Sequence, residues 1–269
     1  MLPDELVILD DNRGMSSLSG MLGPTSPALR AARAILTSEQ RLLLCTGFPV
    51  NEGSETDGPA GTIVLARALA ELKREFVVVS WAEALSSWAF ALGDLPSMAI
   101  RRGAAAPPLP GVAVTIEVCG RTADGAYYNM RGVDVGSKAP WFEDVVGSHA
   151  LVSVGDGGNE FGMGSAPERW FATRTVKRPI STCDVLVVGQ VSNWGALAIV
   201  ACLALLTGRR LLPEPNEYQE LLAQLARGGA MDGVSKIVQA TEDGFDLGRG
   251  STIITGLQRW LDANPTAPP

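Results

Sequence analysis

Histidine is nearly absent from this chain of 269 residues, in which His149 is the single example. A zinc site with two histidine ligands is therefore excluded, and a Ser-His-Asp triad would need every partner to converge on His149. His149 directly precedes an apolar run, which favours a structural histidine. We expect neither zinc nor haem, so acid–base chemistry must come mainly from carboxylates, lysine, tyrosine or the backbone.

Cysteine and positive charge are also scarce. The four cysteines lie far apart in apolar surroundings without a CxxC pair, which is typical of reduced core thiols. The chain has 22 Lys and Arg against 29 Asp and Glu, which gives a net charge of −7. We therefore expect no basic stripe and no nucleic-acid partner, although a local basic pocket for a small anion stays open.

The sequence also lacks a recognisable targeting or membrane segment. The N-terminus, MLPDELVILDDNRG, carries acids where a signal or transit peptide would carry basic residues, so we expect a cytoplasmic protein. The longest uncharged run, residues 185–208, is interrupted by Gln190, Ser192 and Asn193. Its first part is β-branched and its second part favours a helix, which indicates a buried strand entering a buried helix rather than a membrane span.

Short runs rich in Val, Ile and Leu recur along the chain, each followed by a Gly- or Asp-containing turn and a helical pattern. This rhythm predicts an α/β fold with a mostly parallel central sheet and helices on both faces. Most runs lack polar alternation, as expected for strands covered on both faces. The predicted strands are residues 6–9, 42–45, 76–79, 112–118, 151–154 and 185–188.

Helices are predicted in the intervals. Ser26 with Pro27 supplies an N-cap and a first helical position, and Pro59 opens another helix. Further helices are predicted at residues 81–92, 140–146, 194–206 and 218–225. We interpret residues 1–269 as a single α/β domain with an irregular, lid-like insertion at about 95–140; whether it forms a homo-oligomer stays open.

Ligands of open parallel sheets bind beyond the carboxyl ends of the strands, where loops enter helix N-termini that attract anions. The loop after the second predicted strand contains Gly47 and Thr56, and it carries Glu52, Glu55 and Asp57 within six residues. One interpretation is a mobile acidic loop with a helix-capping aspartate. The other is a site for a hard cation, or a base that accepts a proton from a substrate.

The segment GDGGNEFGMG, residues 155–164, holds five glycines in ten residues directly after a predicted strand. Such density is usually accepted where the backbone takes a positive φ or approaches a ligand closely. The spacing departs from GxGxxG, and Asp156 and Glu160 would crowd a pyrophosphate with negative charge, so NAD is not expected. We interpret this segment as part of a site rather than as a tight structural turn.

Other polar residues follow strands or lie in the irregular middle of the chain. Ser192 and Asn193 lie between a strand and a helix, where capping and ligand binding are both open. Tyr128 and Arg131 belong to a polar stretch that also holds Glu117, and Arg13 lies near the N-terminus with Asp10 and Asn12. Arginine is the natural bidentate partner of a carboxylate, although surface ion pairing is the alternative. Residues 231–234 and 241–244 are ordinary turns or parts of the same site.

Several of these strings resemble a known family. In chain order they are NRGM, TGFPV, ETDGPAGT, YYNMRGVD, GDGGNEFGMG, VSNWGA and DGVSK. Together they closely resemble the D-glutamate cyclase family, over residues 12–244. The resemblance implies a lyase that closes D-glutamate to 5-oxo-D-proline with loss of water, and the preference for the D form rests on this likeness alone.

This chemistry needs partners for two carboxylates and an ammonium group. The γ-carboxylate is a poor electrophile because its charge is delocalised. A divalent cation, Mg²⁺ or Mn²⁺, on Glu55, Asp57, Asp156 or Glu160 would act as a Lewis acid, or Arg and backbone N–H groups would stabilise the oxyanion. The metal ligands that we expect are Glu55, Asp57 and Asp156.

We hypothesise that Asp156 or Glu160 is the acid–base group, with Asp57 as a further catalytic residue. Arg131 and the Ser192–Asn193 turn hold the α-carboxylate, and the GDGGN backbone faces the reacting carboxylate. The expected substrate-binding residues are Arg13, Gly47, Thr56, Tyr128, Arg131, Gly157, Gly158, Asn159, Ser192 and Asn193. The partner is thus a small anionic amino acid, without nucleic acid or membrane.

Two other functions fit the same loops. A binding protein could recognise an acidic amino acid or a phosphate metabolite without converting it, although a pure anion receptor would avoid so many carboxylates. A metal-assisted amide hydrolase would run the reverse chemistry. Incubation with D- and L-glutamate, with and without a divalent cation, distinguishes these functions by the appearance of 5-oxoproline.

Overall fold

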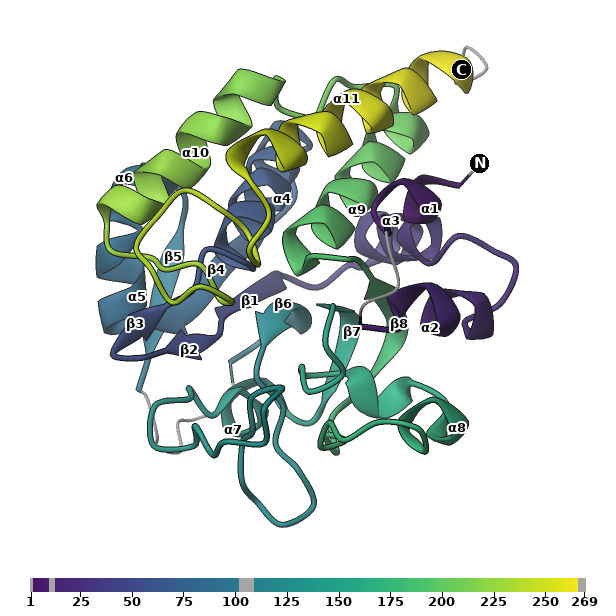
Figure 1. Ribbon diagram of the computed structural model, residues 1–269. Helices are drawn as coiled ribbons and strands as arrows, with labels where there is room; N and C mark the ends of the chain where they lie inside the picture. The colour runs from purple at the N-terminus through teal and green to yellow at the C-terminus, as the bar shows by residue number, and fades with distance from the viewer. Residues whose placement is uncertain (1, 10–12, 102–108, 266–269) are drawn as a thin grey trace.

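The computed structural model describes residues 2–9, 13–101 and 109–265, and six parallel strands form its central sheet (Figure 1). The strands are β1 (Leu42–Gly47), β4 (Phe76–Trp81), β5 (Ser97–Ile100), β6 (Val112–Val118), β7 (His149–Gly155) and β8 (Thr182–Val188). Their order is β5-β4-β1-β6-β7-β8. A small antiparallel hairpin, β2 (Pro49–Val50) and β3 (Gly53–Ser54), follows β1. The predicted α/β fold with a parallel sheet is confirmed.

The central strand β1 lies between β4 and β6, with Leu42 in register with Phe76 on one side and with Val112 on the other. From β1 the chain proceeds outward to β4 and β5. It then returns to β6, on the other side of β1, and proceeds outward to β7 and β8. The loops after β1 and β6 therefore diverge at the carboxyl end of the sheet, which is where ligands of such folds bind.

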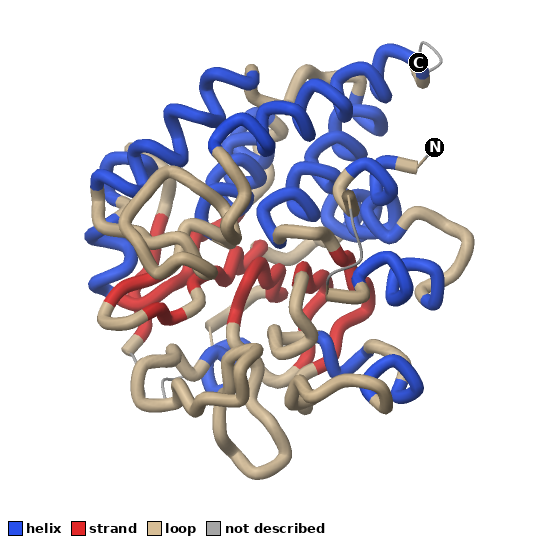
Figure 2. The backbone as a smooth tube through the Cα atoms, viewed as in Figure 1, coloured by secondary structure: helices blue, strands red, loops and turns tan. Residues whose placement is uncertain are grey.

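Helices cover both faces of the sheet (Figure 1, Figure 2). One face carries α3 (Pro27–Thr37), α4 (Pro59–Glu71) and α9 (Ser192–Thr207), with α1 (Pro3–Leu6), α10 (Pro215–Arg227) and α11 (Leu247–Ala263) outside them. The other face carries α2 (Met15–Met21), α7 (Phe142–Val146), a 3-10 turn (Met163–Ser165) and α8 (Glu168–Phe171). The short helices α5 (Ala82–Ser87) and α6 (Ala89–Leu92) follow β4. Each face has its own apolar core, which explains why the strands are continuous apolar runs.

The long uncharged run of the sequence forms the end of β8 and all of α9. Helix α9 packs against α3, α4 and α11, and its residues 192–204 are all buried. A helix that is enclosed by its neighbours needs no polar stripe. In the part of the chain that the structure describes, none of the helices is both long enough and apolar enough to cross a lipid bilayer.

Five of the six predicted strands are confirmed, because each of these apolar runs becomes a strand of the sheet. The strand predicted at residues 6–9 is wrong. Pro3 begins helix α1, with Asp4 and Glu5 in its first turn, and this combination favours a helix. Strand β5 was not predicted: it has only four residues, of which Ser97 and Ala99 are exposed and Ile100 alone is buried.

The helix predicted at residues 81–92 is wrong at its start, because Trp81 ends β4 and Trp88 separates α5 from α6. The other predicted helices are present, whereas α2 and α11 were not predicted. The segment predicted as irregular, about 95–140, contains β5 and β6. From residue 119 to residue 141 the chain forms only isolated bridges, turns and bends, so this stretch of the segment is irregular.

Helices α4 and α9 begin side by side, and a side chain at the start of each helix accepts backbone N–H groups at the start of the other. Asp57, before α4, accepts the backbone N–H groups of Ser192 (2.9 Å) and Asn193 (2.7 Å) at the start of α9. The side-chain oxygen of Asn193 accepts the N–H groups of Gly58 (2.9 Å) and Gly61 (2.7 Å) at the start of α4. Helix N-termini usually satisfy these groups with a cap of their own. The exchange fixes two strand-end loops relative to each other.

Asn193→Ala is expected to destabilise the protein strongly. The substitution removes the acceptor of the Gly61 N–H group and the amide donor to the Thr56 carbonyl and to Glu242, and it leaves the Gly58 N–H group with Asp57 as its acceptor. All of these positions are buried. Because each unsatisfied buried group costs about 1–3 kcal/mol, we expect a loss of about 3 kcal/mol or more in the free energy of unfolding, measured in urea. The exposed Asn216→Ala on α10 is the control, with a change within about 0.5 kcal/mol. Equal effects of the two substitutions would contradict the role of the exchanged caps.

Candidate active site

A small cavity lies at the carboxyl ends of β1, β6 and β7, between the diverging loops. Its volume is about 130 Å³. A water molecule occupies roughly 30 Å³ of liquid, so the cavity suits a small metabolite rather than a macromolecule. Segments far apart in the sequence form its wall: residue 13, residues 48–55, residue 117, and residues 129–131, 156–160 and 233–243.

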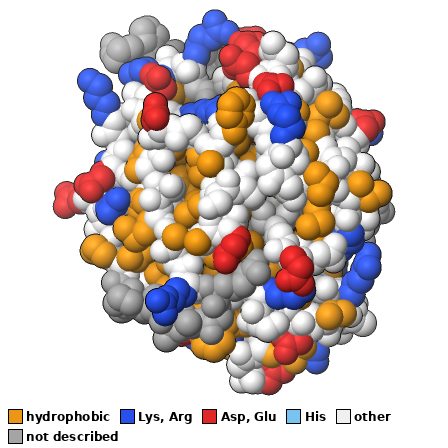
Figure 3. All heavy atoms as spheres, turned by 90° about the vertical axis from the view of Figure 1, so that its left-hand side faces the viewer, with side chains coloured by type: hydrophobic (Ala, Val, Ile, Leu, Met, Phe, Trp, Pro, Cys, Tyr) orange, Lys and Arg blue, Asp and Glu red, His pale blue; other side chains and the backbone are white. Residues whose placement is uncertain are grey.

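Buried negative charge is the main property of this cavity. The carboxylates that line it are those of Glu55, Glu117, Asp156, Glu160 and Asp243. Glu117, Asp156 and Glu160 each offer an oxygen within 4.8 Å of the others, and Asp156 forms a second such group with Asp57 and Asp243. On the surface shown in Figure 3, by contrast, acidic side chains are scattered among Lys and Arg. The cavity therefore concentrates acidic groups where water cannot screen them.

Burial and mutual repulsion raise the pKa of these carboxyl groups. Burial raises the pKa of Glu117, and the charges of Asp156 and Glu160 raise it further. Burial also raises the pKa of Glu55, to which neighbouring carboxylates add. For Asp156, burial raises the pKa by more than the Arg13 guanidinium lowers it. Raised carboxyl pKa values of this kind are typical of acid–base residues at active sites.

Three positive side chains line the same cavity. Arg13 forms ion pairs with Asp156 and, at 2.6 Å between Nη1 and Oδ2, with Asp243. The charge of Asp156 is the main cause that raises the pKa of Arg13, and it outweighs the effect of burial. Arg131 and Lys236 are exposed and lie at the mouth of the cavity. An anionic ligand therefore meets positive charge at the mouth and at Arg13, and negative charge deeper inside.

Two buried oxygens of the cavity wall have no hydrogen-bond partner among the described residues. They are Glu55 Oε1 and Asn159 Oδ1, on side chains of residues that are 6% and 3% exposed. Asn159 Nδ2 donates to the carbonyl of Tyr128 at 3.0 Å, which fixes the orientation of the amide. Buried acceptors without a donor are rare. Because they lie on a cavity wall, these two oxygens are suited to an electropositive ligand.

Backbone strain is concentrated at the same place. In the described residues, a positive φ occurs at five non-glycine positions, and three of them line the cavity: Glu117 (47°), Lys236 (62°) and Asp243 (51°). Side chains with a Cβ rarely adopt this conformation, and it costs of order 1–3 kcal/mol per residue. Glu117 adopts it at the end of β6, so its carboxyl group enters the cavity instead of continuing the alternation of the strand.

Two buried acids hold the segment of residues 231–245, which forms one wall. Asp232 accepts the N–H groups of Ser235 (2.7 Å) and Gly244 (2.8 Å). Burial raises the pKa of Asp232, but these donors outweigh burial and hold the pKa below its ordinary value. Glu242 accepts the side-chain amide of Asn193 at 2.8 Å. The segment is thereby attached to the start of α9.

The structure brings many, but not all, of the sequence-predicted residues to the cavity wall. Those that line it are Arg13, Glu55, Arg131, Asp156, Asn159 and Glu160. The predicted residues that do not line it are Gly47, Thr56, Asp57, Tyr128, Gly157, Gly158, Ser192 and Asn193. Asp10 and Asn12 lie outside the described residues.

Some of these other residues support neighbouring elements. Gly47, with φ at 116°, packs against Trp81, where a Cβ would lie 2.6 Å from the indole ring. The hydroxyl of Thr56 donates at 2.6 Å to a backbone carbonyl of the 231–245 segment. The hydroxyl of Tyr128 donates to Asp124 at 2.9 Å, in an exposed position. These contacts are structural interactions of the loops and do not reach the cavity.

Other predicted residues hold the carboxylates of the cavity in place. The N–H groups of Gly157 and Gly158 donate to the two oxygens of Glu160, each at 2.7 Å. The hydroxyl of Ser192 donates to Glu117 Oε2 at 2.7 Å. The glycine-dense segment thus orients an acid with its backbone, and the start of α9 orients another.

The predicted metal ligands are brought together only in part. Asp57 and Asp156 belong to one group of close oxygens, but its third member is Asp243 rather than Glu55. The oxygens of Asp57 accept three backbone N–H groups, including that of Gly58 at 2.8 Å. The structure therefore uses Asp57 as the cap of a helix.

Sequence reasoning assigned no role to Glu117, Lys236 and Asp243, which line the cavity. Glu117 is the sixth residue of an apolar strand, and an acid within VAVTIEV was the available signal. Lys236 and Asp243 lie in the turns near the C-terminus. The motif DGVSK was the signal there. No strand of the sheet leads into this segment, so the expectation that ligands bind in loops after strands does not apply to it.

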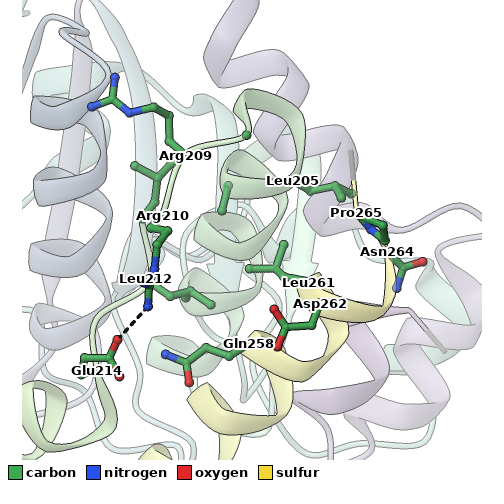
Figure 4. Close-up of a pocket in the computed structure, with 13 residues that line it drawn as sticks. Leu205, Arg209, Arg210, Leu212, Glu214, Gln258, Leu261, Asp262, Asn264 and Pro265 are labelled. Carbon is green, nitrogen blue, oxygen red and sulfur yellow. Dashed lines mark hydrogen bonds and ion pairs between the residues drawn. The ribbon is translucent and has the colours of Figure 1, made fainter. Parts of the chain in front are cut away.

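A second hollow, of about 540 Å³, lies between the ends of α9 and α11 (Figure 4). Its labelled apolar side chains include Leu212 and Leu261, and its ion pair joins Arg210 to Glu214 at 3.3 Å. The side chains of this pair are 93% and 53% exposed, so their charges are solvated. No group of close carboxylates occurs there among the described residues, and the hollow is not a candidate for catalysis.

Comparisons with known proteins identify the family of this chain. The family model described as D-glutamate cyclase-like, C-terminal, matches residues 4–258. The human mitochondrial D-glutamate cyclase is 28% identical over 278 residues, an alignment that covers 81% of this chain and 45% of the relative. The chain thus spans less than half the length of that relative.

Glu117→Gln is expected to raise the melting temperature at pH 7.5 in the presence of EDTA. The folded pKa of Glu117 is raised, so its stabilising contribution is complete below the unfolded value of about 4.3 and is lost as pH rises through the folded pKa. Glutamine keeps an acceptor for Ser192 and carries no charge. We expect a gain of about 2–4 °C by calorimetry at pH 7.5.

The same comparison at pH 4 supplies the internal control, because there the carboxyl group is mostly protonated in both states and most of the gain should vanish. Glu39→Gln, at an exposed position, should change the melting temperature by less than about 1 °C at either pH. A lower melting temperature for Glu117→Gln at pH 7.5 would show that the ionised carboxylate is stabilised by its surroundings.

Proposed function

Because the chain belongs to the D-glutamate cyclase-like, C-terminal family, we propose that it is a lyase that closes D-glutamate to 5-oxo-D-proline with loss of water. The observation that carries this proposal is the crowded set of buried carboxyl groups at the switch point of the sheet, with Arg13 among them. The preference for the D form is taken from the name of the family and of the human relative.

The reaction moves protons as well as heavy atoms. The nitrogen of the substrate forms a bond to the γ-carboxyl carbon, and a carbon–oxygen bond breaks. The ammonium group has three protons and the lactam nitrogen keeps one, so two protons must reach the oxygen that leaves as water. A carboxyl group with a pKa raised towards neutrality can accept a proton from nitrogen and return it to oxygen.

Glu55 is the cavity carboxylate that we assign to proton transfer. The other carboxylates that line the cavity have partners: Arg13 for Asp156 and Asp243, backbone N–H groups for Glu160, and a hydroxyl for Glu117. Glu55 Oε1 has none among the described residues. Burial and the neighbouring carboxylates raise the pKa of Glu55, which favours its protonated form at a higher pH than for an exposed glutamate.

The carboxylates of the substrate need positive partners. Arg131 and Lys236 at the mouth are the groups that we assign to the α-carboxylate, since both are exposed and neither forms an ion pair with a described residue. Arg13 lies deeper, between Asp156 and Asp243. The substrate ammonium is attracted by the acidic wall, which gives the molecule one orientation in the cavity.

The proposal is tested by incubating the protein with D-glutamate or L-glutamate and separating 5-oxoproline on a chiral column. We expect 5-oxo-D-proline from D-glutamate and a much slower reaction of the L form. Binding of glutamate by calorimetry without any lactam would favour a non-catalytic binding protein. Hydrolysis of 5-oxoproline in preference to its formation would favour an amide hydrolase.

Glu55→Gln is expected to lower the rate of lactam formation by about 10²–10⁴-fold, because a general acid–base group contributes this much. Glu52→Gln is the matched control: it lies in the same loop, its side chain is 86% exposed, and it does not line the cavity. Its rate should stay within about twofold of the unchanged protein, as for a surface substitution.

The same assay decides between Glu55 and the earlier hypothesis of Asp156 or Glu160. If Asp156→Asn or Glu160→Gln abolishes the reaction while Glu55→Gln does not, the proton is carried on the other side of the cavity. Retained activity in all three variants, each shown to be folded by circular dichroism, would contradict both assignments.

A further inference from the structure

We infer that Glu117, Asp156 and Glu160, together with the amide oxygen of Asn159, form a binding site for one hard divalent cation of the Mg²⁺ and Mn²⁺ class. These residues form one wall of the cavity. The chemical role of the cation, neutralising this wall beside the reacting carboxylate, rests on the proposed function. Its binding can be measured without any catalysis.

The distances suit a cation of this class. The three carboxylates offer one oxygen each within 4.8 Å of one another, and all three residues are buried. Oxygen ligands at about 2.1 Å from one ion lie at most about 4.2 Å apart, so small side-chain movements bring these oxygens onto one ion. All the ligands offered are oxygens, which favours Mg²⁺ or Mn²⁺ over metals that prefer nitrogen or sulfur.

The protein supplies a positive partner for only one of the three carboxylates of this wall. Of the Lys and Arg side chains in the described residues, only Arg13 forms an ion pair with any of the three carboxylates, and it reaches Asp156 alone. Burying charge without compensation is costly, so the group must bind protons or a cation. A substrate ammonium supplies one positive charge, whereas a divalent cation supplies two.

Asn159 provides the independent observation. Its Oδ1 atom is buried and has no hydrogen-bond partner among the described residues, although its Nδ2 atom is held by the Tyr128 carbonyl. A Cβ placed on Gly157 would lie 2.7 Å from Glu160 Oε1 and 2.9 Å from Asn159 Oδ1. These two oxygens therefore lie on the same side of the Gly157 backbone. A neutral amide oxygen with no donor, next to carboxylate oxygens, is a suitable ligand for a hard cation.

The second group of close carboxylates, Asp57, Asp156 and Asp243, lacks this property. Asp57 accepts three backbone N–H groups, and Arg13 donates to both of the other members. Arg13 thus pairs with two members of this group, whereas Glu117 and Glu160 form no ion pair with a described Lys or Arg side chain. The site is therefore assigned to the group that contains Glu117 and Glu160.

The inference is tested by titrating the EDTA-treated and dialysed protein with Mn²⁺ and following free Mn²⁺ by electron paramagnetic resonance. We expect one Mn²⁺ per chain. Glu117→Gln and Asp156→Asn should each weaken binding by at least about tenfold, and Asn159→Ala by about 10-fold or less. Asn159→Asp, which adds a negative charge at the same position, should tighten it.

Glu143→Gln is the matched control, because Glu143 is buried but bonded to Tyr127 and does not line the cavity. Its Mn²⁺ affinity should equal that of the unchanged protein. Mn²⁺ should also raise the melting temperature of the unchanged protein, but not that of Glu117→Gln, because an ion that binds only the folded state stabilises it.

The inference is overturned if the folded protein binds no Mn²⁺ at about 1 mM, the weak end of specific cation sites. It is also overturned if Glu117→Gln and Asp156→Asn bind as tightly as Glu143→Gln. Lactam formation that persists in EDTA, without Mn²⁺ binding, would remove the cation site and leave the proposed function intact. Mn²⁺ binding without lactam formation from either enantiomer would contradict the proposed function and leave the cation site intact.

Discussion

The burial of several negative charges around one small cavity is the constraint on which the rest of this structure depends. A carboxylate that leaves water loses several kcal/mol of hydration, so it must gain donors, a cation or a proton. The chain uses different solutions for neighbouring acids. Asp57 receives backbone N–H groups, Asp156 receives the guanidinium of Arg13, and Glu117 remains among other acids with a raised pKa. The architecture around the cavity supplies these partners.

The parallel sheet makes this possible because it gathers strand ends and helix N-termini on one edge. The starts of α4 and α9 supply N–H groups, and the glycine-dense segment after β7 wraps its backbone around Glu160. Replacing buried ionic groups by well-packed apolar side chains often leaves the stability of a protein unchanged or raises it. The acids and the strained φ angles of Glu117 and Asp243 occur together at this cavity, as is common where backbone strain belongs to a functional site.

Apolar runs and strand-end loops were enough to predict the class of fold, five strands and six of the residues that line the cavity. These patterns could not distinguish residues that line the cavity from residues that only position the loops around it. Asp57 and Asn193 are polar loop residues like Asp156, yet they cap helices, and only the three-dimensional pairing of α4 with α9 distinguishes these roles. Glu117 was hidden within an apolar strand, because its inward direction depends on one positive φ. The 231–245 segment reaches the cavity through tertiary contacts that no local pattern encodes.

The exchange of caps makes positions 57 and 193 a single unit in evolution, although they lie 136 positions apart in the chain. A change at Asp57 alone removes the acceptor of N–H groups at the start of α9. A change at Asn193 alone does the same at the start of α4. Tolerated changes must therefore occur together, or with a new donor and acceptor arrangement at both ends. Among related chains this pair should covary more tightly than residues of the surrounding apolar core, where many substitutions of similar volume are interchangeable.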